Sequence, residues 1–493
     1  MNFEYITPEK AGISSEKILR FIKTLEEYNF CTHSMIMSRG NKIFTELYYA
    51  PFSDKFLHRM YSVSKSFISV ALGMAMEDGL LSLDDKMVDY FTEYDGWQND
   101  EKYKEATIRD LLTMESAVMD GTFWFTTGTK DRNEVYFRKP SEKIPGTLFY
   151  YDSPGSYMLG VIVEKVTGKP FLEYLKEKAL TELGFSNDSY CIKAPGGYSF
   201  GDSGVMCTAK DLLIFARFVM NKGICNGKSY MKSDYLTEAV KKQVCNDNNS
   251  MWGYNTFGYG YQIWKTPRDG FAFIGMGDQF AICDPKTDFI FIINSDNQGN
   301  TASRPVLYHT LYKEIVEILG EPLEENPKAY EELCEHIKNA RLHSLPQSED
   351  EGLISEINNK KYILEKNPMG IEYIKFSFEG KKGLLQYKNA QGEKELMFGI
   401  GYNEFGKFPE TGYSDMVTGE VAPGHMYDCA CSAVFAESKK LRIKVQIIDK
   451  YFGNASFVFS FKDNRVGISM MKTAENFLEE YNGTAIGKIE GGN

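Results

Sequence analysis

The sequence predicts an α/β protein of the α+β type, with an antiparallel sheet flanked by helices and a separate all-β domain behind it. Three observations predict this. Strand-like runs stand near both ends of the first 325 residues, a long and mostly helical insert separates them, and alternating runs recur after residue 352. Strands separated in this way can still pair in one antiparallel sheet with helices packed against it.

Composition narrows the classes of protein. At 493 residues, with 43% hydrophobic and 25% charged residues, the chain is an ordinary globular protein of two or three domains. A net charge of −12 without a long basic stretch argues against a nucleic-acid partner. No run reaches the length of a membrane span and the N-terminus has no targeting pattern, so we expect a cytoplasmic protein without a membrane partner. Nine scattered cysteines without a C-x-x-C pair, and six unclustered histidines, predict no disulfide frame, no metal and no cofactor.

The chain begins with a helix and a hairpin. Residues 14–28 predict a helix with Ser14 or Ser15 as its cap. Ser34–Ser38 and Lys42–Tyr48 predict two strands around an Arg-Gly-Asn turn. The hairpin would have exposed edges unless later strands pair with it.

The segment Ser62–Met76 is almost entirely apolar, apart from one narrow stripe at helical spacing that consists of Ser62, Lys65, Ser66, Ser69 and Gly73. Gly79 stands where a helix would stop. A helix that is apolar nearly all round is buried. Ser62 and Lys65 place a hydroxyl and an amine one turn apart, and a desolvated lysine can help deprotonate a hydroxyl. The alternative is that Ser62 is an ordinary N-cap and that Lys65 reaches solvent.

The later strands and a closing helix complete the first domain, residues 1–325. The predicted segments are the strands Gly258–Trp264, Phe271–Ile274, Gln279–Cys283 and Phe289–Asn294, and a helix from about Ser303 to Leu319.

Residues 326–351 predict a connecting helix and a linker, because Asn326–Leu342 has a helical pattern and Pro346–Gly352 is a polar break. Residues 352–493 alternate between strand-like runs and turns, which predicts a small barrel or sandwich without a catalytic constellation. We expect this domain to shield the cleft of the first domain or to support a homodimer.

Six segments then occur in a characteristic order, namely Ser62–Phe67, Gly79–Asp85, Thr107–Met114, Pro145–Ser153, Gly258–Trp264 and Asp284–Pro285. Together they resemble the serine β-lactamase and penicillin-binding-protein superfamily, specifically its class C-like hydrolase branch, over residues 1 to about 320. Ser62 and Lys65 match its nucleophile motif. Tyr151-Asp152-Ser153 is similar to its second motif, Tyr-x-Asn. The resemblance implies a β-lactamase-like fold for the first domain.

The third motif of the superfamily carries a lysine or histidine, and at that place this chain has Phe273-Ile274-Gly275. A phenylalanine offers no cation to the carboxylate of a β-lactam or a peptide. Gly275–Gln279, and Ser153 in place of asparagine, instead resemble 6-aminohexanoate-dimer hydrolase and related carboxylesterase-like members. We therefore expect Ser153, Phe273, Gly275 and Gly277 to bind substrate, with the glycines allowing close approach of the backbone.

The resemblance and the residue chemistry together predict a serine hydrolase that acts on a small ester or a linear amide. Ser62 would form an acyl-enzyme. Lys65 and Tyr151 both remain candidates for the base that takes the proton of Ser62, because ammonium and phenol groups both have reference pKa values of about 10. The backbone N–H groups of Ser62 and Met276 would bind the oxyanion. The alternatives are a β-lactamase or D,D-peptidase, or a catalytically silent binding protein on the same fold.

A second motif competes with this interpretation. Gly201–Gly204 resembles the nucleophile segment of trypsin-like proteases, which would need an all-β chain with an upstream histidine. His33 and His58 stand in no such context, and the stretch fits a glycine turn before a helix over Thr208–Phe218.

Overall fold

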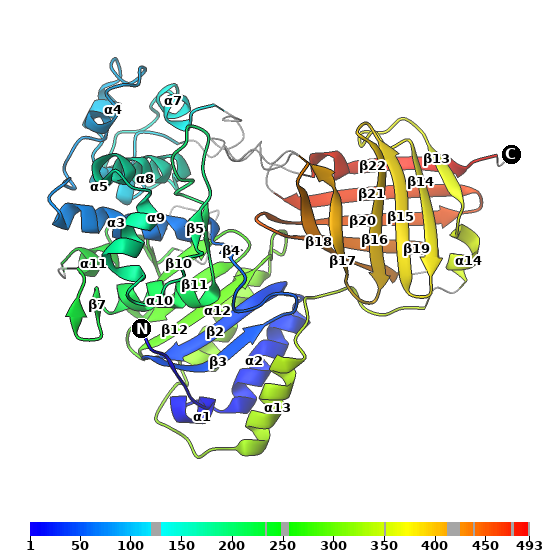
Figure 1. The fold of residues 1–493 in the computed structure, drawn as a ribbon, viewed down its shortest axis with the longest axis horizontal. Helices are drawn as coiled ribbons and strands as arrows, with labels where there is room; N and C mark the ends of the chain where they lie inside the picture. Colours follow the sequence, from blue (N-terminus) through cyan, green and yellow to red (C-terminus); the bar gives the residue numbers. More distant parts are fainter. Residues whose placement is uncertain are drawn as a thin grey trace. The chain divides into compact units, whose positions relative to one another are not determined.

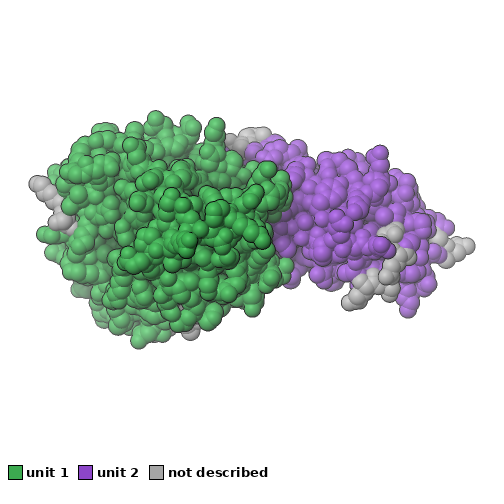
Figure 2. All heavy atoms as spheres, turned by 90° about the horizontal axis from the view of Figure 1, so that it is seen from below, with its two compact units in different colours: residues 1–341, 417–420 green, residues 342–416, 421–493 purple. Residues whose placement is uncertain are grey.

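The structure is a computed structural model, and it describes residues 1–119, 130–231, 234–247, 256–349, 352–411, 424–436, 439–474 and 478–491. These residues form two compact units (Figure 2). The first unit holds Met1–Arg341, and the second holds the described residues from Leu342 onward.

The first unit is built on a sheet of seven strands within the described residues, in the order β1-β3-β2-β12-β11-β10-β9 (Figure 1). The strands are β1 Glu4–Tyr5, β2 Thr32–Arg39, β3 Lys42–Tyr48, β9 Trp264–Lys265, β10 Phe271–Gly275, β11 Gln279–Asp284 and β12 Phe289–Ser295. Its neighbours are antiparallel except β1 and β3. The predicted antiparallel sheet is therefore confirmed, and β12 covers the edge of the N-terminal hairpin by pairing with β2.

Shorter elements surround this sheet. The small strands are β4 His58–Arg59, β5 Tyr190–Cys191, β6 Val205–Cys207, β7 Ile224–Cys225 and β8 Lys228–Ser229. The helices of the unit are α1 Pro8–Ala11, α2 Ser15–Glu27, α3 Ser64–Glu77, α4 Glu101–Glu105, α5 Ile108–Leu112, α7 Arg132–Phe137, α8 Ser153–Thr167, α9 Phe171–Leu175, α10 Ala209–Met220, α11 Asp234–Ala239, α12 Ser303–Leu311 and α13 Pro327–Lys338. There are 3₁₀ turns at Tyr61–Val63, Met87–Tyr90 and Pro267–Asp269, and π-helical turns at Lys176–Leu180 and Tyr312–Val316.

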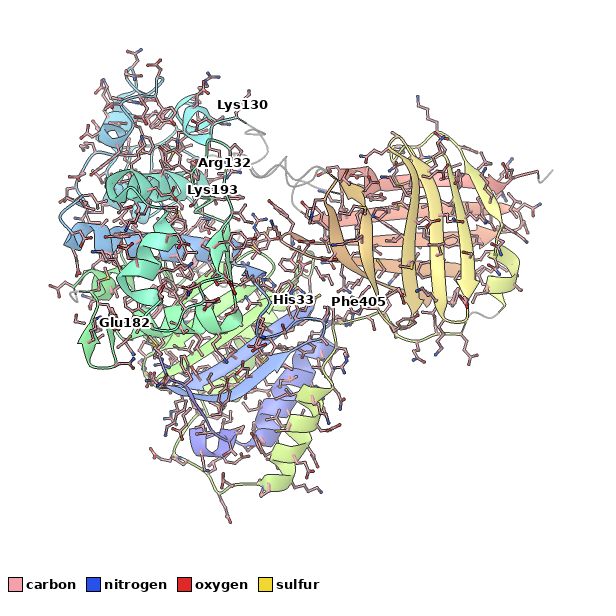
Figure 3. All side chains as sticks on the ribbon, in the orientation of Figure 1. His33, Lys130, Arg132, Glu182, Lys193 and Phe405 are labelled. Carbon is pink, nitrogen blue, oxygen red and sulfur yellow. The ribbon has the colours of Figure 1, made fainter. Side chains whose placement is uncertain are left out.

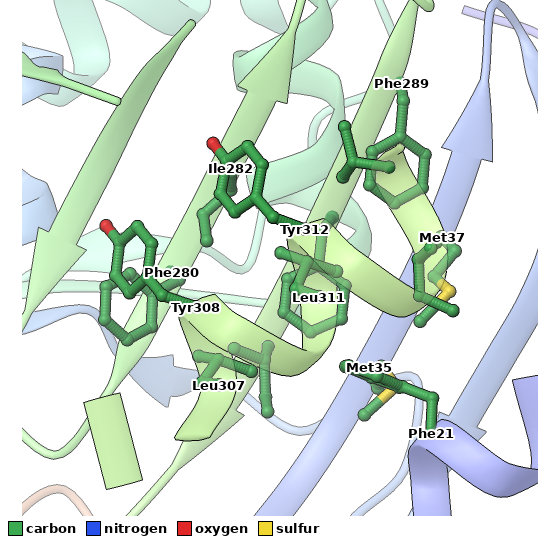
Figure 4. Close-up of a cluster of buried hydrophobic side chains, with 14 of the residues drawn as sticks. Phe21, Met35, Met37, Phe280, Ile282, Phe289, Leu307, Tyr308, Leu311 and Tyr312 are labelled. Carbon is green, nitrogen blue, oxygen red and sulfur yellow. The ribbon is translucent and has the colours of Figure 1, made fainter. Parts of the chain in front are cut away.

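Helices cover both faces of the sheet. On one face, α2, α12 and α13 bury an apolar cluster, in which Phe21 lies near Met35 of β2 (Figure 4). The ring of Phe21 also packs edge-on against that of Phe291. On the other face, Phe215 of α10 lies against Phe273 of β10 and stacks on Phe67 of α3. The helical insert between β3 and β9 thus packs against the sheet through α10, and it also carries α3.

Most predicted elements are present, and one strand is wrong. The first helix, α2, begins after Ser14, whose side chain accepts a hydrogen bond from the Lys17 N–H. The predicted strand Gly258–Trp264 is a turn-rich segment in which only Trp264 begins a strand. The reason is Gln262, which has a φ of 58° in the left-handed region and makes long-range hydrogen bonds with side chain and backbone.

Helix α3 is as buried as its composition predicts. Every residue from Ser64 to Ala75 is buried, and the chain leaves the helix through Gly79 at a φ of 72°. The polar stripe is satisfied inside the protein, because the Ser66 hydroxyl donates to the Gln262 carbonyl and Ser69 pairs with the Tyr235 hydroxyl. Ser62 and Lys65, at the start of the stripe, are therefore the members considered below as catalytic residues.

The second unit is a closed barrel rather than a sandwich. Among its described residues, nine strands close in the order β16-β15-β14-β13-β22-β21-β20-β19-β18, and β16 returns to β18, with β17 added on β18. The elements are α14 Leu353–Ile357, β13 Lys361–Leu364, β14 Tyr373–Glu379, β15 Lys382–Asn389, β16 Gly392–Ile400, β17 Glu404–Thr411, β18 Met426–Phe435, β19 Lys440–Ile448, β20 Phe452–Lys462, β21 Arg465–Ala474, the 3₁₀ turn Glu479–Tyr481 and β22 Gly483–Ile489.

The predicted connecting helix, α13, belongs with the first unit, where Leu333 joins the core beneath α2. Of the linker predicted over Pro346–Gly352, Asp350 and Glu351 lie outside the described residues. In the part of the chain that is described, no helix is long and apolar enough to cross a membrane.

Candidate active site

Ser62 is held in the 3₁₀ turn Tyr61–Val63, directly before α3. Tyr61, one residue earlier, has a φ of 48°, an uncommon conformation for a side chain of this size. The Met60 N–H donates to the Val205 carbonyl at 2.8 Å and ties this turn to β6. Val63, not Ser62, is the N-cap of α3, and it makes no side-chain cap bond. The Ser62 hydroxyl therefore does not serve as a cap.

Lys65 lies one turn further on and is only 1% exposed. Its Nζ donates to Ser62 Oγ at 3.0 Å and to the backbone carbonyl of Asp202 at 2.8 Å. The alternative in which Ser62 caps the helix and Lys65 reaches solvent is therefore wrong.

Tyr151 completes a cluster with these two residues. Its ring stacks on Trp264 with centroids 5.4 Å apart and an angle of 24° between the planes. The Lys65 ammonium lies 5.2 Å from the centre of the Tyr151 ring, within the range of a cation–π contact. The structure thus brings Tyr151 to Ser62 and Lys65, which lie one turn apart at the start of α3.

The two residues after Tyr151 begin helix α8. Asp152 is its N-cap and accepts a hydrogen bond from the Gly155 N–H at 2.9 Å and another from the Ser116 hydroxyl. Burial raises the pKa of the Asp152 carboxyl, while these bonds oppose that rise. Ser153 is the first residue of the helix and is half-buried. In the Tyr151-Asp152-Ser153 segment, the middle residue therefore caps the N-terminus of α8.

The end of β10 lies against the backbone that precedes Ser62. A Cβ on Gly275 would stand 2.4 Å from the Met60 carbonyl oxygen, so this approach requires a glycine. Met276 lies just beyond the strand, in the turn 276–278, where Gly277 has a φ of 75°. Gln279 fixes that turn, since its Nε2 donates to the Met276 carbonyl at 2.9 Å.

Phe273 does not lie at a surface. Its side chain is completely buried in β10, with its ring 5.2 Å from that of Phe215. At the place where the superfamily carries a cation, this chain therefore has an aromatic contact between the sheet and α10.

Sequence reasoning missed Gln262, which binds three helices together. Its carbonyl accepts from the Ser66 hydroxyl at 2.8 Å, its Oε1 accepts from the Ser156 hydroxyl at 2.7 Å, and its Nε2 donates to the Leu111 carbonyl at 2.9 Å. These bonds fix α3, α8 and α5 relative to one another beneath the cluster. No local sequence pattern predicts this role, because the hydrogen-bond partners of Gln262 lie more than a hundred residues away in the chain.

Sequence reasoning also missed Asp202, which it placed in a glycine turn. The side chain is fully buried, and its Oδ2 lies 4.0 Å from Lys65 Nζ. Burial raises the pKa of the Asp202 carboxyl to about 7, against the opposing effect of Lys65, Arg132 and Arg59. The one signal in the sequence was an acidic residue three positions before the apolar run of β6.

A metal centre has no candidate in the described ranges, because no group of three His, Cys, Asp or Glu side chains there could hold an ion.

Comparison with known proteins identifies a protein family for this chain. Residues 20–311 match the family model described as Beta-lactamase. The 6-aminohexanoate-dimer hydrolase of Paenarthrobacter ureafaciens is 24% identical over 311 residues, which cover 58% of this chain and 78% of that protein.

Two solved structures show the same fold. The octameric penicillin-binding protein homologue from Pyrococcus abyssi has a TM-score of 0.50 at 15% identity, covering 96% of this chain and 99% of that chain. EstCE1, a hydrolase with promiscuous acyltransferase activity, has a TM-score of 0.50 at 14% identity, covering 60% of this chain and 99% of that chain.

Proposed function

Because the chain belongs to the β-lactamase family, we propose that it is a serine hydrolase that forms an acyl-enzyme at Ser62. The observation that carries the proposal is the 3.0 Å hydrogen bond between Lys65 Nζ and Ser62 Oγ in a site where Lys65 is almost completely buried. A buried lysine is costly and is retained where it does chemistry or is well paired.

The reaction divides one difficult step into two. The Ser62 oxygen attacks the substrate carbonyl carbon, its proton passes to a base, and the carbonyl electrons move onto the oxygen. The leaving group then departs with a proton, and water releases the acyl group by the same route in reverse. Lys65, which contacts Ser62, and Tyr151, whose ring lies beside Lys65, are our two candidates for handling the proton. The backbone N–H groups of Ser62 and Met276 are our candidates for the oxyanion site.

We propose a small ester or a linear amide as the substrate. Relatives named for hydrolysis of a linear amide and for acyl transfer support this class. The lack of a cation at Phe273 supports it as well, because a charge-assisted hydrogen bond contributes about 1.5–3 kcal/mol. Losing such a bond to a β-lactam carboxylate would lower transition-state binding by about ten- to a hundredfold.

Labelling with a fluorophosphonate probe tests the nucleophile. The wild-type protein should gain one label by intact mass, and Ser62→Ala should gain none. Ser66→Ala is the matched control, because it removes a buried hydroxyl from the first turn of α3, four residues after Ser62. Equal labelling of Ser62→Ala and the wild type would refute the proposal and would favour a catalytically silent binding protein.

A substrate panel tests the class of bond. We expect good turnover of short p-nitrophenyl esters, measurable turnover of a linear 6-aminohexanoate dimer, and weak turnover of nitrocefin or penicillin. Efficient penicillin hydrolysis beside poor esterase activity would instead indicate a β-lactamase or a D,D-peptidase. The panel is a cleaner test than Phe273→Lys, since that variant would bury an unpaired ammonium against Phe215.

For the barrel, we propose a role in self-association as a homodimer. Exposed apolar side chains on its outer strands support this, including Phe405, which is 47% exposed on β17 (Figure 3), and Met397, which is 41% exposed on β16. An octameric relative whose fold spans nearly the whole chain supports it too. Light scattering on the full chain and on Phe405→Ser should show a dimer and a weakened dimer, and a monomeric wild type would refute the proposal.

A further inference from the structure

Three buried cations converge on the single carboxylate of Asp202. Lys65 lies 4.0 Å from it, and Arg59 and Arg132, which are 0% and 1% exposed, act on it electrostatically. Arg132 comes from α7 in the helical part of the unit (Figure 3), and Arg59 comes from β4. Three buried positive charges around one negative charge are expensive unless each has a partner.

The arginines also have partners of other kinds. Arg59 donates to the carbonyl and the hydroxyl of Ser203, at 3.0 and 3.1 Å, and Arg132 lies 4.2 Å from the ring centre of Phe200. The two carboxyl oxygens of Asp202 accept no hydrogen bond among the described residues, and Oδ2 forms an ion pair with Lys65 Nζ at 4.0 Å. Of the three cations, Lys65 is the one whose nitrogen also contacts the Ser62 hydroxyl.

Asp202 holds Lys65 at two points. The Asp202 backbone carbonyl accepts a hydrogen bond from Lys65 Nζ at 2.8 Å, and the Asp202 carboxyl oxygen Oδ2 lies 4.0 Å from the same nitrogen. The remaining direction of the Lys65 nitrogen is taken by Ser62 Oγ at 3.0 Å. The same residue thus supplies both the anchor that aims Lys65 at Ser62 and the negative charge that favours its protonated form.

We infer that Asp202 is a positioning residue that keeps Lys65 as an ammonium donating a hydrogen bond to Ser62. The inference rests on the proposed serine hydrolase function. A protonated Lys65 cannot accept the proton of Ser62. The Ser62 proton therefore passes to the Tyr151 oxygen as the bond from Ser62 Oγ to the acyl carbon forms, while the Tyr151 hydroxyl gives its own proton to the departing group as the bond from the acyl carbon to that group breaks.

The surroundings of Asp202 define which other groups could alter its charge. The titratable and charged side chains that act on it are Lys65 from α3, Arg59 from β4, Arg132 from α7, Tyr157 from α8 and Cys191 from β5. Burial raises the pKa of the Tyr157 phenol and of the Cys191 thiol, which opposes the ionisation of both groups. Any pH effect lost with the Asp202 carboxyl thus comes from that carboxyl and from the amine it faces.

The rate of fluorophosphonate labelling of Ser62 between pH 5 and pH 10 tests the inference. If Lys65 must be charged, the alkaline limb of the profile reports the loss of its proton. Asp202→Asn should then move that limb to lower pH by about 1–3 units, because an opposite charge within about 4–6 Å has an effect of that size. Asp202→Glu, which keeps the charge, should keep the limb near its wild-type position.

Two further variants make the test decisive. Asp284→Asn removes another fully buried carboxylate of the same unit, paired with Arg268, and should leave the limb unchanged. If Asp202→Asn fails to fold, Asp202→Ser removes the same charge. A purely structural role would lower the labelling rate at every pH without moving the limb, and that outcome overturns the inference.

Movement of the acid limb instead of the alkaline limb would also overturn it, because Lys65 would then act as a neutral base. If the wild type takes no label at all, the hydrolase proposal fails, and this inference fails with it. If the wild type is labelled at Ser62 and the limb does not respond to Asp202, only this inference fails.

Discussion

Replacing Asp202 by asparagine should change how the stability of the first unit depends on pH. Burial raises the pKa of this carboxyl from its ordinary value of 3.8 to about 7. Between those values the folded protein binds a proton that the unfolded chain does not hold. The free energy of unfolding therefore falls as pH rises through this window, by about 1.4 kcal/mol per unit and about 4 kcal/mol in total.

The variant lacks this titration, so the difference between the two proteins isolates it. Asparagine does not titrate, so the cost of leaving Lys65 without an ionic partner is a constant term in the stability of the variant from pH 5 to pH 8. The informative quantity is thus the slope against pH and not the offset. From pH 5 to pH 8 the wild type should lose about 2–3 kcal/mol of unfolding free energy relative to the variant.

Urea unfolding followed by tryptophan fluorescence measures this slope in the right part of the molecule. All four tryptophans precede residue 342, so their signal reports the first unit and not the barrel. Asp284→Asn serves as the control, because it removes another fully buried carboxyl of the same unit, one that faces Arg268 and not Lys65. Parallel pH curves for the wild type and Asp202→Asn would refute the argument that burial dominates the titration of this carboxyl.

Further predictions concern the catalytic cluster and the two units. Lys65→Ala and Tyr151→Phe should each slow acylation of Ser62 by several orders of magnitude with strongly non-additive losses, measured by labelling rate, and near-normal activity would remove that residue from the mechanism. Gly275→Ala should slow acylation about a hundredfold, because its Cβ would displace the Met60 carbonyl by about 1 Å, whereas Gly320→Ala, whose Cβ lies 3.7 Å from its neighbour, should not. A fragment that ends at Arg341 should fold and take the label, and an insoluble or unlabelled fragment would show that the units share a core.

Local periodicity accounts for what the sequence could predict. The hairpin of β2 and β3, the strands β10 to β12 and the buried helix α3 were all visible, because apolar spacing and turn residues determine such elements locally. The segment Gly258–Trp264 had the same strand-like composition and still forms a turn. There the hydrogen bonds of Gln262 to residues about 150 positions away decide the conformation, and composition carries no record of them.

The same distinction applies to the site. Ser62 and Lys65 are three residues apart, so helical spacing alone placed the hydroxyl beside the amine. Asp202 is 137 residues from Lys65. Its effect on Lys65 depends on the 4.0 Å distance between the carboxyl oxygen and the amine nitrogen in the folded protein, which the spacing of the two residues in the sequence does not reveal. For Phe273, the order of the segments along the chain was enough to assign the residue to the third motif. Its burial against Phe215 was not predictable in this way, because it depends on how α10 packs on the sheet.

The charges at this site are also an argument about function. Asp202, Lys65, Arg59 and Arg132 are all nearly inaccessible to water, although each could be replaced by an apolar side chain in an ordinary core. Such an arrangement lowers stability and persists where a reaction requires it. A protein that had kept the fold only to bind a ligand would have no need for a carboxylate aimed at the amine that faces Ser62. The pairing of Asp202 with Lys65 therefore favours turnover at Ser62 over simple binding on this fold.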